Sequence, residues 1–331
     1  MENEQTLLAR QIDSAGDQAE YDSQVKNLLA NKAILAWILK TCTEEFAQYT
    51  PEEIMPCIEG DPEISRKAVH AVDLDSDQRE KLLPGDSKVE GRNTEDNNGK
   101  DQTVYYDIRL NACTRDETPI SLIINIEAQR NSSPGYPIER RAIYYCGRLI
   151  SAQYGTVFSH SEYGKIRKVY SIWICSEPSA EKKNTIQRVF LDSEAVFGNI
   201  NLKKENIDLM QVLIVNLGDP DSPINNQILR LLNVLLSDKT DTNAKKRVLE
   251  DEYHIAMSRE LESEVSRLCD LSQGIFEKGV SQGFNQGIIV GTVETLREDG
   301  KDDKVIVERI MRKYHLTRAE AEAYVLETCA V

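Results

Sequence analysis

Cysteine and histidine are sparse in this chain and form no cluster. Seven cysteines occur singly among 331 residues, and there are only four histidines. No cysteine pair has the close spacing of a zinc ligand set, which argues against a zinc site. An odd, unpatterned count is typical of reduced thiols in a cytosol. We therefore expect a cytoplasmic protein whose chemistry is carried by other residues.

Long apolar runs and phosphate-binding glycine motifs are also missing. No apolar run has the length of a membrane span, and the first thirty residues contain no basic segment followed by an apolar one. Neither a GxxxxGKS/T loop nor a GxGxxG turn after a strand occurs. We expect no membrane partner and no nucleotide-binding loop of these kinds.

Basic residues are in the minority. The chain has 55 acidic side chains against 40 Lys and Arg, a formal net charge of −15, which opposes binding to a polyanion at long range. The balance is uneven, because residues 1–100 carry 21 acidic and 11 basic side chains while residues 130–168 carry two acidic and seven basic. We expect contact with DNA to be local and weak, and centred on the second segment. A solvated surface helix is the alternative.

Two neighbouring segments, residues 105–110 and 121–129, alternate between apolar and polar side chains as half-buried strands do. If they pair as a hairpin, Asp107, Glu127 and Gln129 project from one face of a small sheet. Two close carboxylates with a third polar group are suited to hold Mg²⁺ for phosphodiester hydrolysis. The same alternation is also typical of an antiparallel hairpin whose polar face is solvated.

The segments that follow favour a site over a solvated face. Residues 137–154 form a predicted helix that carries Arg140 and Arg141 close behind the carboxylates. Two later segments, 168–175 and 212–217, are nearly continuous apolar runs, which is typical of central strands covered on both faces. The carboxylates would then lie in a crevice between a sheet and its helices.

The order of these segments resembles the PD-(D/E)XK nuclease superfamily, and specifically its Rpn-like branch of recombination-promoting nucleases and transposase-like proteins. The resemblance covers about residues 25–240. The stretches that carry it are residues 105–109 (YYDIR), 124–129 (INIEAQ), 141–145 (RAIYY) and 168–174 (KVYSIWI).

The resemblance implies an α/β, restriction-endonuclease-like fold, with a mixed central sheet flanked by helices and a helical C-terminal extension. It also implies Mg²⁺- or Mn²⁺-dependent hydrolysis of DNA, with Asp107 and Glu127 as metal ligands. Gln129 stands where most of the superfamily has lysine, and would orient the water or the phosphate. Arg140 and Arg141 are candidate phosphate contacts. Glu45 is a candidate further ligand, or else part of a solvated helix face.

Four parts are expected along the chain. We predict a polar segment at 1–24, a nuclease-like domain at 25–240 with an acidic insertion at about 59–100, a long helix at 241–298 and a small helical module at 299–331. Within these parts, residues 25–49 and 244–273 each read as one helix. Residues 304–325 read as two short helices.

Four glycines recur every fourth residue in the tail, at Gly279, Gly283, Gly287 and Gly291. Each costs about 1 kcal/mol relative to alanine in a helix, and close packing of two copies of the helix would offset that cost. This predicts a homo-oligomer, with an unpacked linker as the alternative reading. A non-catalytic interaction protein that assembles through this helix is therefore the alternative to the endonuclease.

Overall fold

The structure is a computed structural model that describes residues 7–64, 95–96, 104–105, 107–114, 122–131 and 135–327. It divides into two compact units, one of Tyr21–Cys269 and one of Met1–Glu20 with Asp270–Val331. The four parts predicted from the sequence are not tested by this division and stay a prediction.

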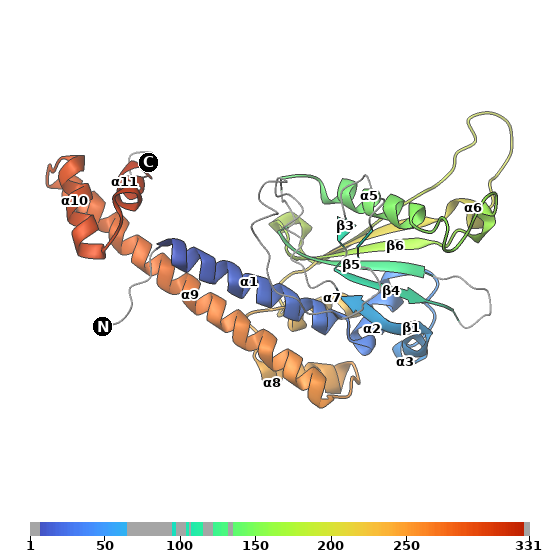
Figure 1. Cartoon of the computed structure of the whole chain (residues 1–331). Coiled ribbons are helices and arrows are strands. Elements are labelled where there is room, and N and C mark those ends of the chain that lie inside the picture. Colours follow the sequence, from blue (N-terminus) through green and yellow to red (C-terminus); the bar gives the residue numbers. More distant parts are fainter. Residues whose placement is uncertain are drawn as a thin grey trace. The chain divides into compact units, whose positions relative to one another are not determined.

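A six-stranded mixed sheet forms the centre of the larger unit, in the order β1-β4-β5-β6-β8-β7 (Figure 1). Its strands are β1 (Ile58–Ile64), β4 (Ile108–Ala112), β5 (Leu122–Asn131), β6 (Val169–Glu177), β7 (Thr185–Phe190) and β8 (Met210–Asn216). The central strands β5, β6 and β8 are parallel, and the outer strands pair antiparallel with their neighbours. The mixed α/β class predicted from the sequence is confirmed.

Short elements and helices connect and cover these strands. They are α1 (Leu7–Leu29), α2 (Lys32–Cys42), α3 (Pro51–Ile54), η1 (Met55–Cys57), β2 (Glu95–Asp96), β3 (Val104–Tyr105), α5 (Ile138–Ser151), η3 (Tyr163–Lys165), η4 (Ala180–Lys182), α6 (Lys204–Ile207), α7 (Gln227–Leu235), α8 (Thr242–Arg247), η5 (Val248–Glu252), α9 (Arg259–Glu298), α10 (Asp303–Tyr314) and α11 (Arg318–Glu327). The two-residue strands β2 and β3 pair with each other apart from the main sheet.

Helices cover both faces of the sheet because the central strands are apolar on both sides. In β6, Ile172 and Ile174 belong to the larger core together with α2 and α7. Val169 and Trp173 point to the other face, where they pack against α5. Figure 1 shows α5 on one side of the sheet and α2 and α7 on the other.

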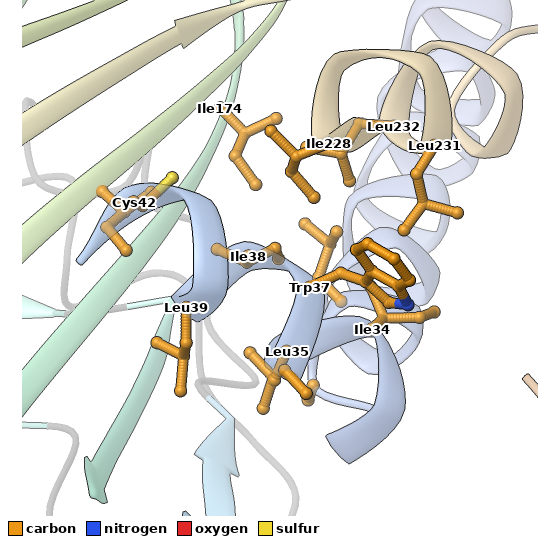
Figure 2. Close-up of a cluster of buried hydrophobic side chains, with 14 of the residues drawn as sticks. Ile34, Leu35, Trp37, Ile38, Leu39, Cys42, Ile174, Ile228, Leu231 and Leu232 are labelled. Carbon is orange, nitrogen blue, oxygen red and sulfur yellow. The ribbon is translucent and has the colours of Figure 1, made fainter. Parts of the chain in front are cut away.

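The larger core is built around α2, whose residues from Ile34 to Leu39 are almost fully buried. Figure 2 shows α2 next to α7, which contributes Ile228, Leu231 and Leu232, with Ile174 of the sheet beside Ile228. The Trp37 ring meets the edge of Tyr253, with 5.0 Å between ring centroids. A helix buried on most sides is what its apolar sequence predicts.

The predicted single helix at 25–49 is wrong, because α1 ends at Leu29 and a new helix starts at Lys32. The Asn31 side chain accepts a hydrogen bond from the Ala33 backbone N–H at 3.0 Å and so caps α2. The short helix α3 begins with a capping box between Thr50 and Glu53 and has Pro51 in its first turn.

The predicted single helix at 244–273 is also wrong. After α8 the chain forms a π turn at Val248–Glu252 and an irregular stretch, and α9 starts only at Arg259. The break places Leu249 and Tyr253 in the core, where the Tyr253 hydroxyl donates a 2.7 Å hydrogen bond to the Gln227 carbonyl. Core burial therefore outweighs the helical periodicity of this stretch.

The smaller unit has its own apolar cluster, formed by one end of α9 with α10 and α11. Its two short terminal helices confirm the prediction for residues 304–325. They are joined at His315, which adopts a left-handed conformation (φ 53°) and ends α10.

Most of the predicted acidic insertion at 59–100 lies outside the described residues. Its first residues do not belong to an insertion, because positions 59–64 form β1, which pairs with β4 at one edge of the sheet.

Candidate metal centre at the β4–β5 pair

The pairing of β4 with β5 places the two predicted metal ligands next to its last residue pair. In the antiparallel register Ile108, the first residue of β4, pairs with Ile126, and positions 107 and 127 are the chain neighbours of this last pair. The predicted hairpin is confirmed, and its register brings these two backbone positions together.

Asp107 lies in the bend just before β4 and is almost completely buried, at 2% exposure. The Lys26 ammonium of α1 lies 2.6 Å from Asp107 Oδ1, and the Lys26 side chain is itself only 5% exposed. A buried carboxylate without a cation would be very costly, so Lys26 is what allows the charged aspartate to remain here.

The sequence analysis did not identify Lys26, although its position among apolar residues indicates a buried lysine. It lies one residue after Val25 and two before Leu28, both of which are core residues. A lysine within an apolar helical stripe must extend to solvent or meet a buried acid.

The side chains of Glu127 and Gln129 lie outside the described part of the structure, but their backbones are placed within β5. Glu127 is in register with Trp173, and Gln129 with Cys175, on the parallel neighbour β6. The position of Glu127 thus belongs to the cross-strand row of Trp173, which lies on the face covered by α5.

Arg141 of α5 lies over the same row. Its guanidinium stacks on the Trp173 ring, 5.6 Å from the ring centroid, and on Tyr145 at 5.2 Å. It donates hydrogen bonds to the hydroxyls of Tyr145 (2.8 Å from Nη2) and Tyr136. Arg141, the predicted phosphate contact, is therefore a cation whose guanidinium is held in place by aromatic rings. Arg140, one residue earlier, is exposed.

A small cavity of about 10 Å³, room for about one water molecule, lies where α5 begins over the carboxyl ends of β6 and β8. Glu139, Lys182 and Asn216 are among the residues that line it. Asn216 Oδ1 is buried and accepts no hydrogen bond from the residues that the structure describes. Burial raises the pKa of the neighbouring Cys175 thiol to about 11, so no thiolate is available here at neutral pH.

Glu45, the candidate further ligand, belongs to a different cluster. It accepts hydrogen bonds from Lys168 Nζ at 2.9 Å and from the Tyr170 hydroxyl at 2.6 Å. Lys168 also contacts Asp208 Oδ2 at 2.6 Å. The sequence did not indicate this network, whose members come from three separate parts of the chain.

Within the side chains that the structure describes, no three His, Cys, Asp or Glu residues gather in a way that would hold a metal ion. Asp107 is a hard oxygen donor of the kind that Mg²⁺ prefers, and the side chain of position 127 lies outside the described part of the structure. These residue types suit a hard divalent cation, with the Lys26 ammonium as its competitor for Asp107.

Comparison with protein-family models, with curated proteins and with solved structures finds no match for this chain. No family is shown. Among the described helices, none combines the length and the apolar composition needed to span a membrane.

Proposed function

We propose that this protein is a Mg²⁺-dependent DNA endonuclease of the Rpn-like type, with a restriction-endonuclease-like arrangement of its sheet. The observation that supports the proposal is the β4–β5 register, whose last pair, Ile108 and Ile126, is next in the chain to the buried Asp107 and to Glu127. The resemblance of the sequence motifs points to the same two residues.

Asp107 and Glu127 would hold Mg²⁺ or Mn²⁺, with the backbone carbonyl of Ala128. When bound, such an ion polarises a phosphate and lowers the pKa of a coordinated water. Gln129 has no charge and can only orient the water or the phosphate. Gln129 is neutral where most of the superfamily has a lysine, but the Lys26 ammonium places a positive charge beside Asp107.

A positioned cation on α5 also supports a phosphate ligand. Arg141 is fixed by two tyrosine hydroxyls and the Trp173 ring, so little side-chain entropy remains to be lost on binding an anion. Arg140 lies beside it at the solvent-exposed side of α5. Both arginines would contact DNA phosphates.

The test is Mg²⁺-dependent nicking of supercoiled plasmid by the full-length protein. We expect Glu127→Gln and Asp107→Asn to reduce the rate at least about a hundredfold. The exposed carboxylate variant Glu194→Gln is the matched control and should cleave like the wild type. Because Asp107 is paired with Lys26, each variant must first give a cooperative unfolding transition. Equal nicking by all four proteins would rule out the assignment.

A second candidate, an assembly function, is favoured by one face of α9. Large apolar side chains recur there every fourth residue and are 41–70% exposed, at Phe276, Val280, Phe284 and Ile288. A Cβ added at Gly283, Gly287 or Gly291 would meet no atom within 4 Å. Small residues next to an apolar ridge suit a closely packed second copy of the helix.

Sedimentation velocity tests this assembly. Phe276→Gln with Phe284→Gln should shift the protein to a smaller species, while Glu277→Gln, on the same helix, should not. A monomeric wild type, or an unchanged sedimentation coefficient in the double variant, would rule out assembly through this helix.

A further inference from the structure

The outward side of α5 carries a row of exposed residues, of which only Arg140 has a role in the proposed cleavage. Arg140, Tyr144, Gly147 and Ser151 are all exposed and follow one another at spacings of four, three and four, so they share one helix face. Tyr154 comes three residues after the last of them, just beyond the end of the helix. Tyr144 is 52% exposed and Tyr154 is 59% exposed.

A third exposed tyrosine joins this row through the loop between α5 and β6. Tyr163 is 66% exposed, and its ring lies 5.8 Å from that of Phe158, which is 8% exposed. Tyr154 meets the same Phe158 ring edge-on at 5.5 Å. The buried Phe158 ring therefore packs against both exposed rings, Tyr154 and Tyr163. We call Tyr144, Tyr154 and Tyr163 the tyrosine surface.

The loop that presents these rings is held by hydrogen bonds. The buried side chain of Gln153 accepts from the Arg167 backbone N–H at 2.7 Å and donates to the Arg167 carbonyl at 2.9 Å. The Gly155 backbone N–H donates to the Phe158 carbonyl at 2.8 Å. Rings held in place lose little freedom when a ligand stacks on them, which favours binding.

The tyrosine surface belongs to a segment of the sequence whose charge is opposite to that of the whole protein. Residues 130–168 carry seven basic and two acidic side chains in a chain with a net charge of −15. Within this segment Arg148 is buried, Lys165 pairs with Glu162, and Lys168 pairs with Glu45 and Asp208. Arg140 lies at one end of the surface, is exposed, and has no ion pair with a described residue; Arg167 lies at the other end.

We infer that the tyrosine surface binds single-stranded nucleic acid, with the tyrosine rings stacked on unpaired bases and Arg140 and Arg167 against phosphates. Aromatic platforms beside basic groups bind single strands in this way, because every base has a face on which a ring can stack. In a duplex those faces are covered by neighbouring base pairs, so the surface selects unpaired strands.

This inference rests on the proposed function for its substrate class, which it narrows to DNA that is single-stranded on one side of the cleavage site. α5 begins beside the strand ends that follow Glu127 and extends for 14 residues, about 21 Å, toward Tyr154. A strand that reaches from the metal centre to the tyrosine surface would follow the outer face of this helix.

Fluorescence anisotropy of a labelled 15-nucleotide poly-dT strand, with full-length protein in EDTA, tests the surface without cleavage. We expect Tyr154→Ser with Tyr163→Ser to weaken binding at least about tenfold, since each stacked base contributes about fivefold or more. Tyr154→Phe with Tyr163→Phe should stay within about twofold of the wild type. Phe197→Ser, which removes a ring that is 97% exposed, is the matched control.

Three outcomes would overturn the inference: no binding by the wild type, equal binding by the serine variant, or an equal loss with a 15-base-pair duplex. The last result would point to general electrostatic binding. If the surface binds a protein partner instead, the serine variant and the wild type should bind the oligonucleotide equally. If the strand binds through the tyrosines but the protein does not nick plasmid, the endonuclease proposal alone is wrong. If the protein nicks plasmid but the serine variant binds the strand as tightly as the wild type, only the tyrosine-surface inference is wrong.

Discussion

Lys26 Nζ lies 2.6 Å from Asp107 Oδ1, and both side chains are at least 95% buried. This ion pair joins α1 to the bend just before β4 through two residues that are 81 positions apart in the chain. It places an ammonium where the proposed metal ion would find its first carboxylate. Lys26 and a divalent cation therefore compete for the same charge.

Replacing Lys26 by methionine tests this competition. We expect Lys26→Met to lower the free energy of unfolding in EDTA by about 3–5 kcal/mol, because Asp107 is left buried without its cation. Millimolar Mg²⁺ should restore a larger share of stability to Lys26→Met than it adds to the wild type, since a bound ion stabilises the folded state by mass action. Urea unfolding with and without Mg²⁺ measures both effects. The same Mg²⁺ response in the two proteins would contradict a metal at Asp107.

The cluster around Lys168 makes a prediction about acid stability. Lys168 is 7% exposed and contacts both Glu45 and Asp208. Burial acts to raise the pKa of Asp208, but hydrogen bonds from Lys168 and Gln211 outweigh it and hold the pKa below its usual value. A lowered carboxyl pKa contributes stability above the unfolded value near 3.9, and this stability is lost as the pH falls through the folded value.

We therefore expect Lys168→Met to destabilise the protein by about 3–5 kcal/mol at pH 7 and by clearly less at pH 3. Lys183→Met, which removes an exposed partner of Asp219, should cost less than about 1 kcal/mol at both pH values. Urea midpoints at the two pH values check this. A penalty that stays constant with pH would mean that Lys168 acts through packing.

For Lys245 we predict the opposite effect: its replacement should stabilise the protein at neutral pH. It is 1% exposed, and burial lowers the pKa of its ammonium, against the opposing effects of Cys269 and Asp238. Below the folded pKa the protein carries the cost of a buried charge, and this cost disappears as the pH rises toward the unfolded value near 10.4. Lys245→Met should raise Tm at pH 7, and the gain should vanish near pH 10.5. A gain that is the same at pH 7 and pH 10 would contradict the charge argument, and exposed Lys203→Met is the control.

Position 218 requires glycine because a larger side chain would clash with Asn184. A Cβ at this position would lie 2.1 Å from Asn184 Oδ1. That oxygen cannot move freely, because it accepts from Asn233 Nδ2 at 3.0 Å while Asn233 Oδ1 accepts from the Gly218 N–H at 2.9 Å. We expect Gly218→Ala to cost about 1–3 kcal/mol in urea unfolding.

Two variants make the Gly218 prediction specific. Gly147→Ala, on the exposed side of α5 with no atom within 4 Å, should be neutral or stabilising by up to about 1 kcal/mol. Asn184→Gly should remove most of the penalty of Gly218→Ala, since glycine accepts the left-handed backbone of position 184 (φ 58°). Additive losses in the double variant would show that the clash is not the cause.

The elements that depend on local pattern were predictable. The hairpin of β4 and β5, the buried strands β6 and β8 and the helix α5 each follow from the period of their apolar residues. The continuous helices expected at 25–49 and 244–273 were wrong, because an Asn31 cap and the burial of Leu249 and Tyr253 interrupt them. Side-chain capping and long-range packing outweigh periodicity in both stretches.

The sequence by itself determined the alternation that marks Asp107 and Glu127, the basic segment after them and the mixed α/β class, since each depends only on neighbouring residues. Tertiary structure alone decided which cation meets Asp107 and that Glu45 pairs with Lys168 and Tyr170. Those relationships join residues far apart in the chain. A buried charge takes whichever partner the packed helices bring to it, and no local pattern records that choice.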